Sequence, residues 1–311
     1  MKENQFNYSQ AAEPTPITEH TYPENTTPWV SISCIAYNHE AFIRDAIEGF
    51  LMQKTTFPVE ILVHDDASTD NTANIIKEYE RHYPSLFNCF YQPENTYHKP
   101  NKRALRKPFK DARKGKYIAL CEGDDYWINP LKLQRQVDFL EANPGTSLVS
   151  HPVLQINMKT GQKKILNPIA KTRKGGLDIR DVILGDGGLI KLNSMVYRRD
   201  LIDHKPGWMQ LAPAGDYALA LLLATRGNLG FINEPMGVYR KMTASSWSVS
   251  MRDPETRRKH YIASQLSLDG FDDWTNQQYS KYVKIKKWKN RFDYYKSWSI
   301  SLAKNIVGNK P

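Results

Sequence analysis

The chain of 311 residues is poor in several features that mark specialised classes of protein. It has three cysteines, Cys34, Cys89 and Cys121, and none stands in a CxxC or Cys/His zinc spacing, which excludes a disulfide framework and a zinc ribbon. Its longest apolar run, 218–224, is far shorter than the roughly 20 residues that a membrane-spanning helix needs. Residues 1–28 are polar and contain no apolar segment of the signal-peptide kind. We therefore expect a globular protein of the cytoplasm.

Two nucleotide-binding motifs are also missing. No GxGxxG follows the first apolar stretch and no GxxxxGK[ST] occurs anywhere, which argues against a dinucleotide cofactor and against a P-loop nucleotide. Acidic residues are scarce at one end of the chain, because residues 281–311 contain nine lysines and arginines and a single acid, Asp293. This end carries a net charge of +8 out of +10 for the whole chain. The charge therefore indicates a basic tail, and we expect nucleic acid not to be the partner.

The sequence does contain a regular alternation of apolar runs and helical patterns. Four apolar runs rich in β-forming residues are typical of strands buried on both faces of a parallel sheet. These runs lie at 29–36, 59–64, 87–91 and 115–121. Helical spacing of apolar residues follows the first two runs, over 40–53 and 70–83. The alternation predicts an α/β fold with a doubly wound, mostly parallel sheet and flanking helices.

The second half of the chain is less regular. We expect strands at 148–156 and 194–198 and an apolar helix at 217–225. From residue 254 onward the pattern predicts helices with a basic, aromatic end.

Polar clusters follow three of the predicted strands, at 37–39, 65–70 and 122–125. Open parallel sheets bind ligands beyond the carboxyl ends of their strands, so we expect these clusters to converge. The crowded carboxylates of Glu122, Asp124 and Asp125 repel one another, and a bound Mg²⁺ or Mn²⁺ would make this arrangement tolerable. The alternative is that the aspartates only begin the next helix as caps.

The segment 65–70 also has two interpretations. Ser68 or Asp70 would cap a helix that begins near Thr72. Capping does not account for the doublet of Asp65 and Asp66, so Asp66 is also a candidate to accept a hydrogen bond from a nucleotide base in the crevice.

The motifs and their order resemble the family 2 glycosyltransferases of the GT-A fold. The resemblance rests on the sequences VSISCIAYN at 30–38, VHDDASTD at 63–70 and KYIALCEGDDYW at 116–127. It implies that residues 29–150 bind a nucleotide sugar and that residues 151–253 bind the acceptor. A polar arm at 1–28, either mobile or lying over the core, and a helical basic extension at 254–311 are outside the resemblance.

The resemblance also implies roles for single residues. The nucleoside would lie against the end of the first strand and the second aspartate of the DDxS turn, at Ala36, Tyr37, Asn38 and Asp66. The EGDD loop would hold the diphosphate through Mn²⁺ or Mg²⁺, with Glu122, Asp124 and Asp125 as the candidate ligands.

A carboxylate opens a helix in the acceptor half of such enzymes, and the GDY sequence at 215–217 matches it. Asp216 would then take a proton from an acceptor hydroxyl while that oxygen displaces the nucleoside diphosphate with inversion. Lys102, Arg103 and Arg106 are candidate cations for the diphosphate, or form part of a solvated basic helix face, and Arg240 is a further candidate. The implied donor is a nucleoside-diphosphate sugar, with UDP favoured, and the implied acceptor is a glycan or a lipid-linked sugar.

Two positions depart from the family pattern. Glu122 replaces the usual first aspartate of the loop, as in the EGDDYW variant of the family. Met242 stands where relatives typically have a histidine that completes the metal or diphosphate site, and a thioether is a poor ligand for Mg²⁺ or Mn²⁺. A non-catalytic protein of the same fold that binds a nucleotide sugar or a glycan is therefore the alternative hypothesis.

The basic end also contains an apolar stripe with steps of three and four residues. Its members are Ile285, Trp288, Phe292, Tyr295, Leu302 and Ile306, with Ser299 as a polar interruption. A helix with this stripe and many lysines either lies on an anionic membrane surface, at its cytoplasmic face, or docks its stripe on the catalytic domain. The sequence leaves both alternatives open.

Overall fold

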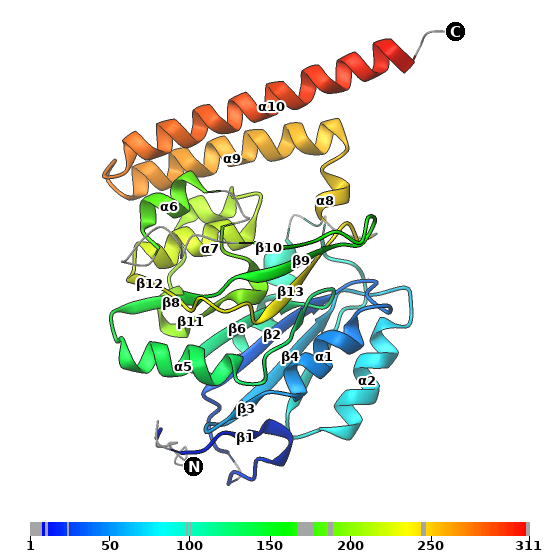
Figure 1. The fold of residues 1–311 in the computed structure, drawn as a ribbon, viewed down its shortest axis with the longest axis vertical. Helices are drawn as coiled ribbons and strands as arrows, with labels where there is room; N and C mark the ends of the chain where they lie inside the picture. The colour runs from blue at the N-terminus through cyan, green and yellow to red at the C-terminus, as the bar shows by residue number, and fades with distance from the viewer. Residues whose placement is uncertain are drawn as a thin grey trace.

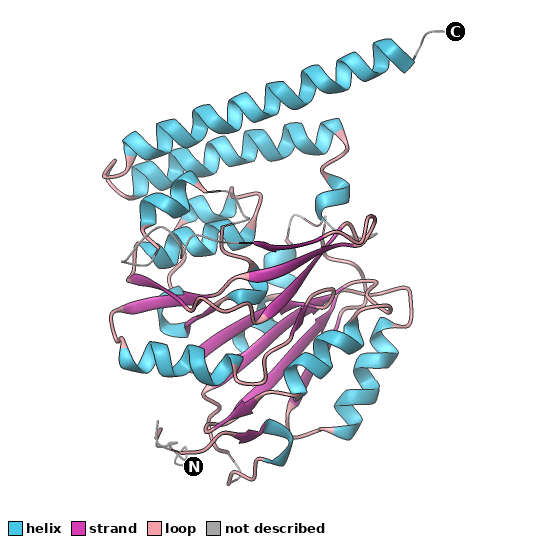
Figure 2. Cartoon of the chain, viewed as in Figure 1, coloured by secondary structure: helices cyan, strands magenta, loops and turns pink. Residues whose placement is uncertain are grey.

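The computed structural model describes residues 8–9, 12–23, 25–97, 99, 101–166, 177–185, 189–243 and 247–308, without the side chains of 247–248 and 297–308. Its centre is a seven-stranded sheet with helices on both faces (Figures 1 and 2). The strands, in spatial order, are β12 (Asn228–Phe231), β8 (Thr146–Ser150), β11 (Val196–Arg198), β6 (Tyr117–Glu122), β2 (Val30–Ala36), β4 (Val59–Asp65) and β5 (Phe87–Tyr91). Only β11 runs antiparallel to its neighbours in this sheet, so the predicted α/β fold with a mostly parallel sheet is confirmed.

Two smaller sheets accompany the central one. The first contains β10 (Lys163–Leu166), β9 (Val153–Asn157), β13 (Gly237–Lys241) and β7 (Tyr126–Trp127), in that order. In the second, β1 (Thr15–Pro16) pairs with β3 (Lys54–Thr55), and the following residue, Ile17, is buried. This pairing lays part of the N-terminal arm along the core.

Helices follow the strands of the first half, as the apolar spacing predicts. They are α1 (Ile43–Leu51), α2 (Thr72–His82), the short α3 (Lys102–Leu105) and α4 (Lys107–Asp111), and α5 (Lys132–Ala142). The second half contains α6 (Ile179–Leu184), α7 (Gly215–Ala224), α8 (Trp247–Ser250), α9 (Pro254–Trp274) and α10 (Ser280–Gly308). Short 3-10 turns lie at Ile17–Glu19, Leu192–Ser194, Arg199–Ile202 and Gly207–Gln210.

The burial of β6 explains how one strand serves two hydrophobic cores. Successive side chains of a strand point to opposite faces of the sheet. Tyr117, Ala119 and Cys121 therefore pack into the core beside α1, α2 and α5. Ile118 and Leu120 pack into the other core, which α6, α7 and the α9–α10 pair complete. A continuous apolar run, rather than alternation, is the sequence signature of such a strand.

The second half differs from the sequence prediction in two places. The expected single strand at 148–156 is divided into β8 and β9, which belong to different sheets. The break falls at His151 and Pro152, and proline lacks the N–H that a continuous ladder needs. The helix expected at 217–225 begins at Gly215, so Asp216 lies inside its first turn and Ala214 occupies the cap position.

The last two helices form an antiparallel pair at the end of the molecule opposite the N-terminus (Figure 1). Helix α10 packs on α9 and α6, and Val283 is the most deeply buried apolar residue among its described side chains, 280–296. No helix in the described part of the chain is both long enough and apolar enough to cross a membrane.

Candidate functional site

The structure brings the three predicted polar clusters together at one edge of the central sheet. Strands β4 and β6 flank β2 on either side and run parallel to it. Beyond the strand ends, the Asp66 N–H donates to Ala36 O at 2.9 Å and the Gly123 N–H donates to Ile35 O at 3.0 Å. The segments 65–70, here called the aspartate turn, and 122–125, here called the acidic loop, are thereby fixed on the two sides of the end of β2.

The acidic loop crowds three carboxylates. Glu122, Asp124 and Asp125 each offer an oxygen, and these three oxygens lie within 4.8 Å of one another. Gly123 allows this approach, since a Cβ there would stand 2.9 Å from His39 Nδ1 and 3.0 Å from Ala36 Cβ. The loop therefore packs against the end of β2 and the start of α1 only because residue 123 has no side chain.

The surroundings of the loop oppose the ionisation of its carboxyls. Partial withdrawal from water and the charges of Asp124 and Asp216 raise the pKa of Glu122 to about 8, although that residue reaches the surface. Burial and the same crowding raise the pKa of Asp125 well above its usual range. Carboxyl groups with raised pKa values that share one site are typical of a site that holds a cation.

The end of β13 supports the acidic loop from behind. The Arg240 N–H donates to Asp125 Oδ1 at 2.8 Å, and its guanidinium donates to Asp124 O at 3.1 Å and pairs with Asp45. The Thr243 hydroxyl donates to Asp124 Oδ2 at 3.0 Å. The chain between them passes through Met242 at φ +71°, a left-handed conformation that is uncommon for such a residue. This backbone places Thr243 against the loop.

Arg240 is engaged by other residues of the chain. It is buried, and its guanidinium lies over the rings of Phe42 and Tyr126, 5.0 and 4.4 Å from their centroids. The contacts found for Arg240 among the described residues are with Asp45, Asp124 and Asp125, and its contact with a diphosphate stays a prediction.

The aspartate turn is held by hydrogen bonds of its own. Asp65 accepts from the N–H and the hydroxyl of Ser68, at 3.0 and 2.5 Å. Asn38, at φ +54°, links the turn to β2, because its N–H donates to Ser68 Oγ and its side-chain oxygen accepts from the Thr69 N–H. Of the two predicted caps only Asp70 contacts the start of α2, where it accepts from the Thr72 N–H at 3.0 Å, and Asn71 occupies the cap position itself.

Asp66 is fully engaged by other residues of the chain. Its Oδ1 accepts from the N–H and the hydroxyl of Thr96, at 3.1 and 2.5 Å. Its Oδ2 accepts from Arg106 Nη2 at 2.6 Å, in an ion pair that is almost entirely buried. Arg106 follows α3 directly, so the segment that contains Lys102 and Arg103 also places a cation next to the aspartate turn.

The other predicted donor-site residues lie around these two segments. Tyr37 is half-buried just beyond the end of β2. Lys102 donates to Tyr97 O at 3.2 Å, and Arg103 donates to Met209 O at 2.8 Å. The contacts found for Lys102 and Arg103 in the described part of the chain are not with the acidic loop, and their contact with a diphosphate stays a prediction.

Asp216 lies in the first turn of α7. Its charge bears on Glu122, and its own carboxylate accepts from the Tyr217 N–H at 2.7 Å. Burial raises the pKa of Asp216, against the opposing effects of that hydrogen bond and of Lys191. A carboxyl whose pKa is raised is better suited to accept a proton near neutral pH.

Sequence reasoning missed Lys191 and Tyr239. The ammonium of Lys191 lies 4.4 Å from the centroid of the Tyr239 ring, and its charge bears on Glu122, Asp125 and Asp216. Lys191 stands in an irregular stretch before the 3-10 turn Leu192–Ser194, without a motif around it. Only the pairing of distant strands brings it to the site, so no local pattern could have identified it.

The acidic loop has the chemistry of a site for a hard divalent cation. Its three donor atoms are carboxylate oxygens, which suit Mg²⁺ and Mn²⁺. Within the described residues no hydrogen bond or ion pair reaches the Glu122 carboxylate. The Asp125 carboxylate receives one donor from β13, and the Asp124 carboxylate receives one from Thr243, just beyond β13. The loop therefore fits a cation by charge, by donor type and by unused hydrogen-bonding capacity.

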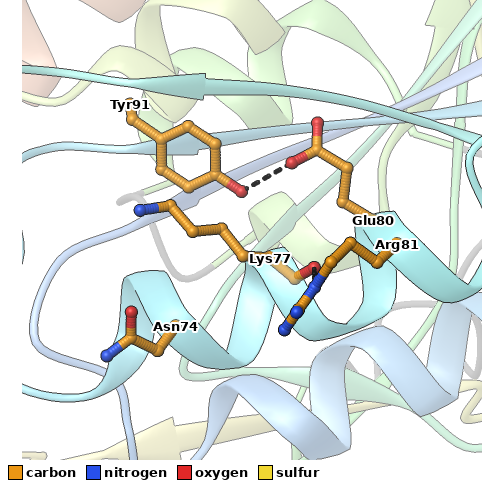
Figure 3. A pocket seen from close by; sticks show the side chains of 5 residues that line it. All are labelled: Asn74, Lys77, Glu80, Arg81 and Tyr91. Atoms are coloured by element: carbon orange, nitrogen blue, oxygen red, sulfur yellow. Dashed lines mark hydrogen bonds between the residues drawn. The ribbon is translucent and has the colours of Figure 1, made fainter.

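A pocket of 560 Å³ lies elsewhere, between α2 and β5 (Figure 3). Asn74, Lys77, Glu80, Arg81 and Tyr91 line it, and the Tyr91 hydroxyl donates to Glu80 at 2.9 Å. None of these residues belongs to the acidic loop, the aspartate turn or the start of α7, so this pocket is separate from the candidate site.

Comparison with known proteins gives a consistent result. The sequence profile of Glycosyl transferase family 2 matches residues 31–204. An uncharacterized protein of Mycobacterium tuberculosis is 38% identical over 239 residues, which are 75% of this chain but only 63% of that protein. The chain thus spans less than two thirds of that relative's length.

Two further proteins are similar over different extents. The enzyme named UDP-Glc:alpha-D-GlcNAc-diphosphoundecaprenol beta-1,3-glucosyltransferase WfaP, of Escherichia coli, is 38% identical over 112 residues, 36% of this chain and 41% of the enzyme. The mannosyltransferase PcManGT of Pyrobaculum calidifontis, solved in complex with GDP-Man and Mn²⁺, superposes with a TM-score of 0.55 at 14% identity, covering 96% of this chain and 79% of that one. This superposition supports the fold.

Proposed function

Because the chain belongs to glycosyltransferase family 2, we propose that it transfers a sugar from a UDP-sugar to a hydroxyl group of a glycan or of a lipid-linked sugar. The observation that carries the proposal is the convergence of the acidic loop, the aspartate turn and Asp216 at one edge of the central sheet. These segments would supply a cation site, a nucleoside site and a base for one reaction.

The donor is proposed to bind to residues 29–150 and the acceptor to residues 151–253. Ala36, Tyr37, Asn38 and Asp66 would surround the nucleoside at the ends of β2 and β4. Arg106 already pairs with Asp66 there, and Lys102 and Arg103 add positive charge on the same segment. The name of WfaP contains UDP-Glc, which supports a UDP-sugar, whereas PcManGT was solved with GDP-Man.

A divalent cation is proposed as the cofactor. Glu122, Asp124 and Asp125 would hold Mn²⁺ or Mg²⁺, and Arg240 and Thr243 would keep the loop in place for it. When bound, the cation would neutralise negative charge on the departing nucleoside diphosphate. The Mn²⁺ in the PcManGT complex supports this assignment, and Met242 leaves the proposed ligands purely carboxylate.

Asp216 is proposed as the general base of an inverting displacement. Its carboxylate would accept the proton of the acceptor hydroxyl while the hydroxyl oxygen attacks the anomeric carbon and the bond to the diphosphate breaks. Its raised pKa, its position at the start of α7 and the effect of its charge on Glu122 support this role. A lipid-linked acceptor is suggested by the diphosphoundecaprenol in the name of WfaP.

The first test is calorimetric binding of UDP, GDP, CDP and dTDP, each with and without Mn²⁺. We expect one diphosphate, UDP, to bind tightly only with Mn²⁺, and we expect Asp124→Ala to abolish this binding. Asp203→Ala, which removes an exposed acid outside the site, is the matched control and should bind as the unmodified protein does. A folded protein that binds none of the diphosphates would contradict the proposal.

Turnover then separates an enzyme from the alternative, a non-catalytic binding protein. The enzyme should hydrolyse or transfer the sugar of the donor that calorimetry identifies, and Asp216→Asn should still bind that donor. A protein that binds the donor but releases no diphosphate with any acceptor would support the binding protein instead.

A further inference from the structure

We propose that the outer face of α10 binds the surface of an anionic lipid bilayer. We define the outer face by four apolar residues, Ile285, Trp288, Phe292 and Tyr295, together with the basic residues Lys281, Lys284, Lys289 and Arg291. The proposal does not depend on transferase activity, because it concerns a surface at the opposite side of α9 from the central sheet (Figure 1).

The four apolar residues are not needed to dock α10. The helix attaches through its other side, where Val283 is buried and Lys286 donates to Gly185 O. Tyr294 stacks on Tyr261 of α9, with ring centroids 4.6 Å apart, and Asn290 donates to Ser264 Oγ at 3.0 Å. The hypothesis that the stripe docks on the catalytic domain is therefore wrong for its described part, and Ser299, Leu302 and Ile306 lie outside the described side chains.

The stripe is instead presented to solvent. Ile285, Trp288, Phe292 and Tyr295 are 45%, 68%, 55% and 52% exposed. The rings of Trp288 and Phe292 stack on each other at 5.8 Å, so together they form one continuous apolar surface. At about 100° per residue, the four side chains fall within a sector of about 80°. Large aromatic side chains gathered on one exposed face indicate an interaction surface.

Basic residues border this sector. At the same rotation of about 100° per residue, Lys284 and Arg291 lie on one border and Lys289 lies on the other, while Lys281 continues the stripe by one turn. Two other lysines of the helix serve the fold, since Lys286 bonds Gly185 and Lys287 pairs with Asp269. An apolar aromatic sector between rows of lysine and arginine is typical of a helix that lies in a membrane interface.

Charge decides between the candidate partners. A second copy of the chain would bring its own lysines against these lysines, which disfavours pairing of two outer faces. Nucleic acid would be attracted by the charge but would leave the aromatic sector without an apolar partner. An anionic bilayer satisfies both parts, because lipid phosphates attract the basic borders and the interface accommodates tryptophan and tyrosine rings.

The test is co-sedimentation of the full chain with vesicles of phosphatidylglycerol and phosphatidylcholine in equal parts, and with vesicles of phosphatidylcholine alone. No nucleotide or divalent cation is added, so an inactive enzyme would give the same result and the two proposals can fail separately. We expect binding to the anionic vesicles, weakening as salt rises, and at least about tenfold weaker binding to phosphatidylcholine.

Paired variants assign the binding to the outer face. Trp288→Ser with Phe292→Ser should weaken binding by at least about tenfold. Met158→Ser with Ile165→Ser, which removes comparably exposed apolar residues around β10, should leave it unchanged. Lys284→Glu with Lys289→Glu should weaken it by at least about tenfold, whereas Lys159→Glu with Lys163→Glu should do so far less. All four pairs are on the surface, and unchanged melting temperatures would establish that they fold.

Three results would overturn the proposal. The first is equal binding by the outer-face variants and their controls, and the second is absence of binding to anionic vesicles. The third is a dimer in sedimentation velocity that Trp288→Ser with Phe292→Ser dissociates, which would assign the face to a second copy of the chain.

Discussion

The aspartate turn and the acidic loop lie on either side of the end of β2, yet their carboxylates differ in hydrogen bonding and in the direction of their pKa shifts. Each aspartate of the turn accepts hydrogen bonds from within the chain, and Asp66 also has Arg106 as a buried counter-charge. Burial opposes ionisation of Asp70, but hydrogen bonds from Thr72 and Glu40 outweigh it and hold its pKa below the usual value. In the loop the pKa values of Glu122 and Asp125 are raised.

The turn satisfies its carboxylates with partners from the chain, whereas the loop leaves its carboxylates short of donors and counter-charge. A carboxylate with its own donors and counter-ion stabilises the fold as it stands. Three carboxylates within 4.8 Å that receive only two donors, from Arg240 and Thr243, cost stability until a cation binds to them. Sites that bind ligands commonly carry such a local cost. The turn should therefore govern folding, and the loop should govern the cation-dependent binding of the donor, whereas catalysis should depend on Asp216.

The largest expected effect separates these two roles. Asp216→Asn should lower kcat by about 10²- to 10⁴-fold, the usual contribution of a general base, while the dissociation constant of the donor stays unchanged. Steady-state kinetics together with calorimetry measure the two quantities. A loss of donor affinity as large as the loss of rate would show that Asp216 serves binding and would remove the distinction.

The positions of the turn and the loop could be predicted from the sequence, because each is a short continuous segment that follows a strand. The strands before 37–39, 65–70 and 122–125 are continuous apolar runs, and parallel pairing brings their ends to one edge. The partners of these segments could not be read. Arg106 is among the predicted diphosphate cations, but no local pattern indicates that it pairs with Asp66. Lys191 and Thr243 reach the site from distant parts of the chain, and no local pattern predicts which strands pair.

The second half shows the same limit at the level of strands. The apolar run at 148–156 predicts one strand, and nothing in its spacing assigns its two parts to different sheets. The stripe on α10 is a further example, since its periodicity is visible in the sequence but its orientation is not. Only the contacts of Val283, Lys286 and Tyr294 establish which side of the helix docks.

A second prediction concerns the stability of the aspartate turn. Asp66→Asn keeps the shape of the side chain but leaves the Arg106 guanidinium buried without its counter-charge, so we expect a loss of about 3 kcal/mol in the free energy of unfolding. Urea denaturation measures this loss. Asp111→Asn is the matched control, because it removes one partner of the exposed Lys107–Asp111 pair and should cost less than about 0.5 kcal/mol. Equal small losses would mean that the turn is not stabilised by its buried pair.

A third prediction uses His64, in the strand that leads to the aspartate turn. Neither of its ring nitrogens has a hydrogen-bond partner among the described residues, and burial together with the charge of Arg106 lowers its pKa to about 4. The folded state therefore binds fewer protons than the unfolded state between about pH 6.5 and pH 4, so stability falls as the pH falls through this window. His64 should account for a loss of about 2 kcal/mol between pH 7 and pH 5.

The variant His64→Leu isolates this contribution. Urea denaturation at both pH values should show a decline that is smaller than that of the unmodified protein by about 2 kcal/mol. His151, which is also buried with a lowered pKa, remains in both proteins, so the difference belongs to His64. An unchanged decline would mean that His64 is not held neutral by the fold.

The smallest expected effect tests the difference between the loop and the turn most directly. The change in the free energy of unfolding caused by Asp124→Asn should have the opposite sign to that caused by Asp66→Asn. Asp124→Asn removes one charge from the acidic loop and keeps an oxygen that can accept from Thr243. Without divalent cations the variant should be more stable than the unmodified protein by about 1 kcal/mol, since repulsion with Glu122 and Asp125 is relieved. With Mn²⁺ the order should reverse, because the ion stabilises only a protein that binds it. Melting curves with Mn²⁺ and with a chelator measure both states. If Asp124→Asn and Asp66→Asn both destabilise the cation-free protein, the carboxylates of the loop are as well satisfied by the chain as those of the turn. Repulsion among them would then not be the reason that the loop binds a cation.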